Sequence, residues 1–118
     1  VAFAASWDGG NVVITGRRRG ALVTETITAV DNSSVDGSKV FDSITSAAKT
    51  AVGANAAAAT IGVGTKIGLP DDLTSARVAM LVDDTVATGY TADTTEDAIT
   101  PASGDVPNAS KDFLILYR

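Results

Sequence analysis

Threonine and other β-branched residues recur on both sides of a short Arg/Gly break near the start of the chain, in residues 11–16 and 21–30. In the first stretch Val12 and Ile14 fall on one face, and the second alternates threonine with apolar residues. Side chains in a strand point to opposite faces with a period of two, so this pattern indicates strands and not a helix. We therefore predict a β-hairpin whose connection is residues 17–20, where Gly20 can adopt a positive φ.

Similar short patterns predict further strands at residues 39–46, 60–63, 66–69, 75–82, 85–92 and 113–117. Residues 75–82 could also form a helix capped by the acids before them. Their length and the Asp83-Asp84 stop favour a buried strand. The polar segment 93–110 contains two prolines and predicts a surface loop. Residues 113–117 are apolar on both faces, which is typical of a central or fully covered strand.

The alanine-rich segment that follows the third predicted strand is ambiguous. Alanine favours a short helix around residues 46–58, but Gly53 and Asn55 interrupt it and no amphipathic face persists. An irregular loop is the alternative. Taken together, the turn spacing predicts an all-β fold, an antiparallel β-sandwich or barrel-like single domain over residues 1–118.

The composition predicts a thin hydrophobic core. Hydrophobic residues make up 45% of the 118 residues, but aromatic residues make up only 5% and most of the rest are alanine and valine. Burial stabilises by roughly 25 cal/mol per Å² of apolar area, so small side chains contribute little. We expect partner surfaces to supply part of the missing burial.

The residue types that are absent exclude most compact enzyme mechanisms. The chain has no cysteine and no histidine, which excludes disulfides, thiolate metal sites and both the Ser-His-Asp and Cys-His triads. Its net charge of −5 disfavours general nucleic-acid binding. No stretch of about 18 apolar residues predicts a membrane span. We therefore expect no catalytic residue, no cofactor, no metal, no nucleic acid and no membrane partner.

Two local patterns have both a chemical and a plain interpretation. The acidic pairs Asp71-Asp72 and Asp83-Asp84 could bind calcium or serve a glycosidase, but no calcium-loop pattern is present and few aromatics could line a sugar cleft. Solvated turn acids are the favoured interpretation. Residues 62–66 resemble a phosphate-binding loop only superficially, because the spacing of its Gly and Lys differs, so a turn is expected there.

Arg17, Arg18 and Arg19 stand where the tip of the predicted hairpin should be. Three guanidinium groups on a protruding tip could bind carboxylates of a neighbouring subunit. The alternative is a solvated turn that only keeps the tip soluble. These three arginines are the candidate partner-contact residues.

The order of several phrases along the chain resembles that of small tailed-phage virion proteins of the head-decoration or cement type. The phrases are VVITGRRRGALVTETITAV, then VFDSITS, then IGVGTKIGLP, and finally GDVPNASKDFLILYR. They cover most of the chain. The arginine-rich tip departs from the Asp/Asn-Gly turn that is usual in such proteins, which leaves the partner of the tip undecided.

The resemblance implies a structural protein on the outside of a phage capsid that stabilises neighbouring capsid subunits. Its partners would be the major capsid protein and further copies of itself, as a trimer or dimer, and its location the virion surface. An Ig-like bacterial surface or adhesin module, which shares the threonine-rich β composition, is one alternative. A phage tail structural protein is the other.

Overall fold

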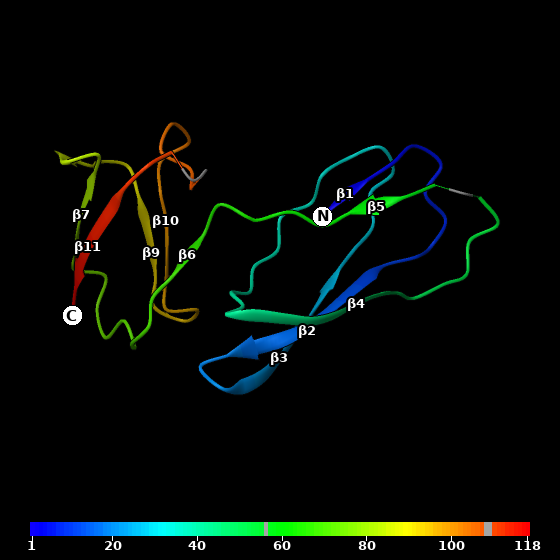
Figure 1. Cartoon of the computed structure of the whole chain (residues 1–118), viewed down its shortest axis with the longest axis horizontal. Helices are drawn as coiled ribbons and strands as arrows, with labels where there is room; N and C mark the ends of the chain where they lie inside the picture. Colours follow the sequence, from blue (N-terminus) through cyan, green and yellow to red (C-terminus); the bar gives the residue numbers. More distant parts are fainter. Residues whose placement is uncertain (56, 108–109) are drawn as a thin grey trace. The chain divides into compact units, whose positions relative to one another are not determined.

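The computed structural model describes residues 1–55, 57–107 and 110–118. Over these residues the chain is all-β, with antiparallel sheets, no helix and no closed barrel, which confirms the predicted fold class. The strands fall into two compact units, Val1–Gly64 and Thr65–Arg118, each with its own hydrophobic core (Figure 1). That residues 1–118 form a single domain stays a prediction.

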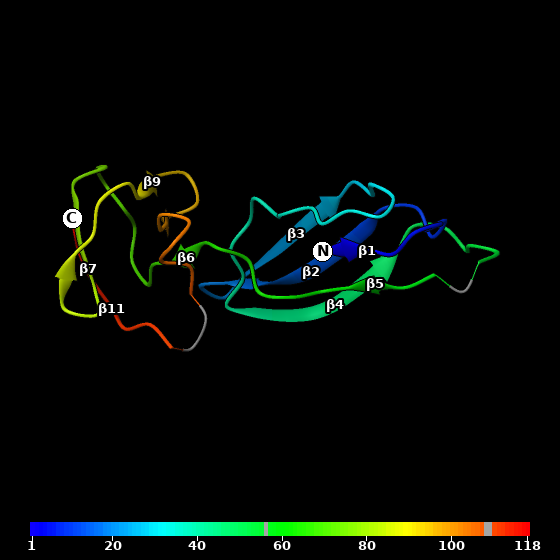
Figure 2. The ribbon, with the colours of Figure 1, turned by 90° about the horizontal axis from the view of Figure 1, so that it is seen from above.

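The first unit contains a three-stranded sheet in the order β3-β2-β4 and a two-stranded sheet of β1 and β5 (Figure 2). Its strands are β1 (Ala2–Phe3), β2 (Val12–Arg18), β3 (Ala21–Ile27), β4 (Ser43–Lys49) and β5 (Ala59–Thr60). Side chains from both sheets bury together: Phe3, Val12, Ile14 and Ile27. The predicted hairpin is therefore confirmed as β2 and β3, with Val12 opposite Ile27 at its base.

Strand β4 lies three to four residues later than predicted, at Ser43–Lys49 instead of residues 39–46. It pairs with β2, and the register shifts at a bulge between Thr15 and Gly16. A Cβ atom on Gly16 would lie 2.2 Å from the Ser43 carbonyl oxygen, so a residue without a side chain is needed where the two strands approach.

The prediction that a short helix could form around residues 46–58 was wrong. Residues 46–49 belong to β4, and no described residue after them is helical; residue 56 lies outside the described residues. Alanine has only a small intrinsic preference for the helix, and the backbone hydrogen bonds that β4 makes along β2 outweigh it.

The second unit consists of two three-stranded sheets, in the orders β6-β10-β9 and β11-β7-β8 (Figure 1). Its strands are β6 (Ile67–Gly68), β7 (Val78–Val82), β8 (Thr85–Val86), β9 (Thr91–Asp93), β10 (Ala98–Thr100) and β11 (Phe113–Tyr117). One buried cluster receives side chains from both sheets and from the loop after β6: Leu69, Leu73, Met80, Val82 and Ile99. The preference for a strand at residues 75–82 is confirmed by β7.

Several predicted boundaries in this half of the chain were wrong. The strand expected at residues 60–63 meets β5 only at Thr60, and the strand expected at 66–69 shortens to β6. The strand expected at 85–92 divides into β8 and β9. The predicted surface loop 93–110 contains β10, and its Ile99 side chain is fully buried. Residues 108–109 of that loop lie outside the described residues.

The position of β11 also corrects an expectation. Residues 113–117 form a strand as predicted, but the strand lies at the edge of its sheet and is not central. Phe113, Ile115 and Tyr117 pack on the core, whereas Leu114 and Leu116 are more than half exposed. The second apolar face of this strand is therefore uncovered in the described chain.

Candidate functional site

The candidate site is the tip of the β2–β3 hairpin. Two residues, Arg19 and Gly20, connect the strands, and their φ angles are 49° and 79°. Positive φ at both central residues is the requirement of a type I′ turn, whose twist matches that of the flanking strands. Glycine meets this requirement easily, whereas Arg19 adopts an uncommon conformation for its residue type.

A carboxylate from elsewhere in the sequence holds this turn in place. Asp42 Oδ1 accepts a hydrogen bond from Arg18 Nη1 at 2.8 Å, and its Oδ2 accepts the backbone N–H of Arg19. The Asp42 N–H in turn donates to the Arg17 carbonyl at 2.8 Å. The N–H of Arg19 and then the Arg18 guanidinium lower the pKa of Asp42. The tip is therefore held by three hydrogen bonds to one residue.

The three arginines that the sequence singled out are not equivalent. Arg17 and Arg18 are consecutive in β2, so their side chains leave opposite faces of the strand. Arg18 is only 15% exposed in its side chain because it binds Asp42. Arg17 is exposed, and its Nη1 donates to the Gly20 carbonyl across the turn at 2.7 Å. The run thus presents the exposed Arg17 and Arg19 at the tip, with Arg18 directed to an internal partner.

The acidic residues bind backbone N–H groups of loops. Asp8 accepts from Ala54 and Asn55, Asp97 accepts from Leu73, and Asp83 accepts from Asp112. Asp83 and Asp84 are the two turn residues of the β7–β8 hairpin, with φ of 50° and 63°. Within the described residues, no group of three or more acids is placed to hold a metal ion. Asp83 and Asp84 are therefore exposed turn acids, and Asp83 also holds the segment before β11 through its hydrogen bond to the Asp112 N–H.

The phosphate-loop interpretation of residues 62–66 has no structural counterpart. No helix follows Lys66 in the described chain, and its Nζ instead lies 3.0 Å from Asp93 Oδ2. A phosphate loop needs the N-terminus of a helix behind it, so this segment lacks the required geometry.

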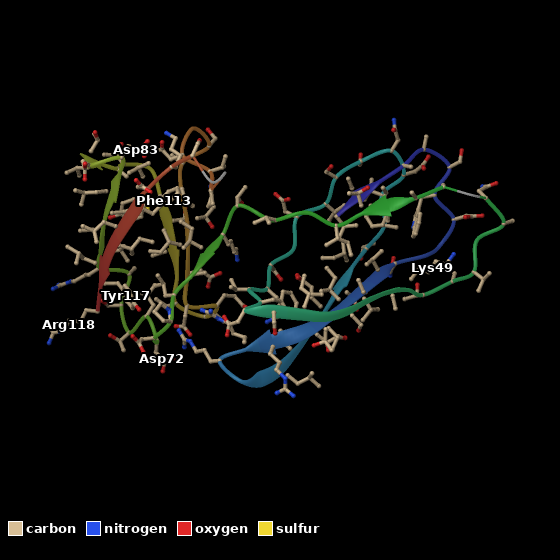
Figure 3. All side chains as sticks on the ribbon, viewed as in Figure 1. Lys49, Asp72, Asp83, Phe113, Tyr117 and Arg118 are labelled. Carbon is tan, nitrogen blue, oxygen red and sulfur yellow. The ribbon has the colours of Figure 1, made fainter. Side chains whose placement is uncertain are left out.

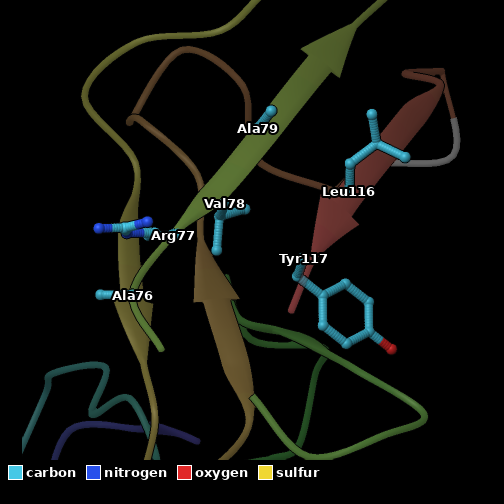
Figure 4. Close-up of a pocket in the computed structure, with 6 residues that line it drawn as sticks. All are labelled: Ala76, Arg77, Val78, Ala79, Leu116 and Tyr117. Carbon is cyan, nitrogen blue, oxygen red and sulfur yellow. The ribbon is translucent and has the colours of Figure 1, made fainter. Parts of the chain in front are cut away.

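A shallow depression lies on the second unit, lined by Ala76, Arg77, Val78, Ala79, Leu116 and Tyr117 (Figure 4). Among the lining residues, Arg77 carries a positive charge and Tyr117 a phenol. The Tyr117 hydroxyl accepts a hydrogen bond from the Asp71 N–H at 3.3 Å. The lining residues of this depression in the described chain include no carboxylate.

Asp42 is the functional residue that sequence reasoning missed. It is 24 residues from Arg18, and its only local signal is its place directly before a threonine- and serine-rich strand. Nothing in that pattern predicts that the strand will lie beside β2 and bring the carboxylate to the tip.

Protein-family models, curated proteins and solved structures give no match for this chain. In the part of the chain that the structure describes, no helix has the length and apolar character needed to cross a membrane.

Proposed function

We propose that this chain is a non-enzymatic structural protein that binds the outside of a phage capsid and holds neighbouring capsid subunits together. The observation that carries the proposal is the arginine hairpin tip, residues 17–20, which the type I′ turn and Asp42 fix in one conformation. The order of its sequence phrases, which resembles that of decoration proteins, supports the same assignment.

A fixed cationic tip suits attachment to a protein surface. Guanidinium groups form charge-assisted hydrogen bonds with carboxylates, and a tip that is already ordered loses little conformational entropy on binding. Attachment also stabilises the attached protein by mass action, which suits a chain with two small cores. The major capsid protein would supply the acidic partner surface.

The proposal is tested by co-sedimentation with phage heads. The reading frames beside this gene identify the source of the heads, because portal, protease and major capsid genes should lie nearby. Purified protein is mixed with heads that lack it, and bound protein is measured after sedimentation at increasing salt. We expect saturable binding that weakens as salt rises.

A matched pair of variants assigns the binding to the tip. Arg17→Ser together with Arg19→Asn removes both exposed tip cations and keeps a residue that tolerates positive φ at position 19. Lys49→Ser together with Arg77→Ser removes the same charge from exposed positions elsewhere. The first pair should lose most head binding and the second should keep it. Binding to tails or to bacterial cells in place of heads would favour one of the two alternatives.

A further inference from the structure

The outer face of the β11-β7-β8 sheet is apolar and uncovered in the described chain. Leu114, Leu116 and Val86 are 56%, 59% and 73% exposed. Ala79 lies opposite Leu116, and Leu81 lies opposite both Leu114 and Val86. Every position that this face offers across its three strands is therefore aliphatic. Exposed apolar patches of this kind mark interaction surfaces.

The backbone of β11 is also unpaired along one edge. The N–H of Asp83 donates to the Asp112 carbonyl at 3.0 Å, which starts the hydrogen-bonded ladder between β7 and β11. Hydrogen bonds alternate along an antiparallel strand, so Leu114 and Leu116 direct their N–H and C=O groups to β7. The backbone groups of Phe113, Ile115 and Tyr117 consequently point to the opposite edge, where β11 has no neighbour in the described chain.

This edge lacks the usual protection against pairing with another strand. Edge strands are normally short, bulged, charged or interrupted by proline. Other edge strands of the described chain have such features. Strand β4 has a bulge and the charged Lys49, β3 has the charged Glu25, and β9 has the charged Asp93. Strands β6 and β8 are only two residues long. Strand β11 has five consecutive apolar or aromatic residues and none of these features.

We propose that β11 pairs with β11 of a second copy of this chain, antiparallel and about a two-fold axis at Ile115. The two sheets then join into one, and the outer leucines of the two copies form one continuous apolar strip. The register follows from the strand itself, because DFLILYR is nearly symmetric about its central residue. Phe113 lies opposite the second copy's Tyr117, and Leu114 opposite its Leu116.

The charges at the two ends of β11 favour a second copy of this chain as the partner of its free edge. Asp112 and Arg118 are exposed and lie at opposite ends of β11; Figure 3 shows Asp83 and Phe113 at one end and Arg118 at the other. In the two-fold register each Asp112 faces the second copy's Arg118, so two opposite-charge pairs close the two ends. The alternation of backbone hydrogen bonds along β11 agrees with this register. The unpaired N–H and C=O groups of Phe113, Ile115 and Tyr117 would bond to the same residues of the second copy.

This inference goes beyond the proposed function and does not depend on it, because it concerns the purified chain without capsids. Sedimentation equilibrium of the full chain tests it. We expect a monomer–dimer equilibrium. Asp112→Arg alone places two cations opposite each other, and Arg118→Asp alone places two carboxylates opposite each other. Each should weaken dimerisation by about tenfold or more.

The double variant Asp112→Arg/Arg118→Asp exchanges the charges and restores both opposite pairs. It should dimerise nearly as well as the original chain, and an equimolar mixture of the two single variants should form mixed dimers. Asp36→Arg, an exposed charge reversal in the other unit, is the matched control and should leave dimerisation unchanged. Circular dichroism checks that each variant keeps its strands.

Cross-linking tests the register directly, because the chain contains no cysteine. Leu114→Cys and Leu116→Cys chains should form a disulfide when mixed and oxidised, since these positions form a close non-hydrogen-bonded pair. Either chain alone should cross-link slowly. A chain that stays monomeric at concentrations on the order of 100 µM overturns the proposal. The proposal is also overturned if the single charge reversals leave dimerisation unchanged. It is overturned as well if the two cysteine variants cross-link equally, alone or mixed.

Discussion

At the scale of single residues, the chain uses carboxylates where other proteins use helix caps or disulfides. Glu25 accepts hydrogen bonds from the Ser38 hydroxyl and from the N–H groups of Ser38 and Lys39, and Asp31 accepts the N–H of Trp7. Loops have no ladder to supply partners for their backbone N–H groups, and side-chain carboxylates supply them here at the surface. These carboxylates therefore help to order the loops.

The first prediction concerns Asp42. Replacing Asp42→Asn removes the charge that binds Arg18 and weakens the acceptor for the Arg19 N–H. We expect the amide of Arg19 to exchange with solvent faster, while amides in the middle of β2 and β3 are unchanged. Hydrogen exchange followed by NMR measures this. Unchanged protection at Arg19 would show that the type I′ turn holds the tip without Asp42.

The second prediction concerns Gly16. In Gly16→Ala the new Cβ would lie 2.2 Å from the Ser43 oxygen and 2.7 Å from the Phe41 ring, so β4 must move. Overpacking of this kind costs about 1–3 kcal/mol in the free energy of unfolding. Urea denaturation measures the loss. Gly62→Ala is the control from the same unit, because nothing lies within 4 Å of its added Cβ.

At the scale of elements, the buried strand β10 is the clearest test of how the second unit is held together. Ile99 is fully buried, and β10 is the central strand of its sheet. We expect Ile99→Ala to lower the free energy of unfolding by about 2–5 kcal/mol. Ile44→Ala, at a side chain 53% exposed, should cost less than about 1 kcal/mol. Thermal and urea denaturation of both variants compare the two costs.

A fourth prediction concerns acid and the ion pair that spans β10. Lys66 precedes β6 and Asp93 ends β9, the strands on either side of β10. The hydrogen bond from Lys66, followed by the N–H of Glu96 and of Thr95, lowers the pKa of Asp93 from 3.8. A carboxyl with a lower pKa in the folded state stabilises the fold above its ordinary pKa, and this contribution is lost as pH falls through the folded value.

The original chain should therefore lose the contribution of this carboxyl to stability as the pH falls below about 4. The variant Asp93→Asn should be less stable near neutral pH and should lose less on acidification. Denaturation midpoints measured from pH 7 down to pH 2 give both curves. Parallel curves for the two proteins would show that Asp93 does not couple folding to pH.

The elements that the sequence predicted are those whose signal is local. The β2–β3 hairpin follows from alternation around an Arg-Gly break, and β7 from an apolar run with an acidic stop. Strand β10 was missed because three residues among polar neighbours give no period, although Ala98 and Ile99 are both fully buried. The tip could be placed at residues 17–20, but its partner Asp42 and the edge position of β11 depend on pairings between distant segments.

At the scale of the whole molecule, each unit has few large buried side chains. Among the described residues, the largest fully buried side chains are Leu69, Met80 and Ile99, all in the second unit, while several leucines and valines stay exposed. The apolar content of the chain is thus divided between its cores and its surface. A protein of this kind gains stability when its exposed apolar faces are covered.

The fifth prediction concerns the dependence of thermal stability on protein concentration. If β11 pairs with a second copy, the midpoint of thermal unfolding should rise with protein concentration, because only the folded chain dimerises. The midpoint of Asp112→Arg should rise less over the same range, because its dimer is weaker. Circular dichroism melts over a hundredfold dilution series compare them. A constant midpoint in both proteins would contradict the coupling.

The two-residue turn at the hairpin tip has a consequence for proteolysis. Trypsin-like proteases cleave after arginine, but they bind several substrate residues as an extended strand and must first pull them out of any ladder. Here Arg17 and Arg18 are paired with Leu22 and Ala21, and only Arg19 and Gly20 lie outside the ladder. A tip with three successive cleavage sequences should therefore survive digestion in the native state, and its cations should stay in place where such proteases are present.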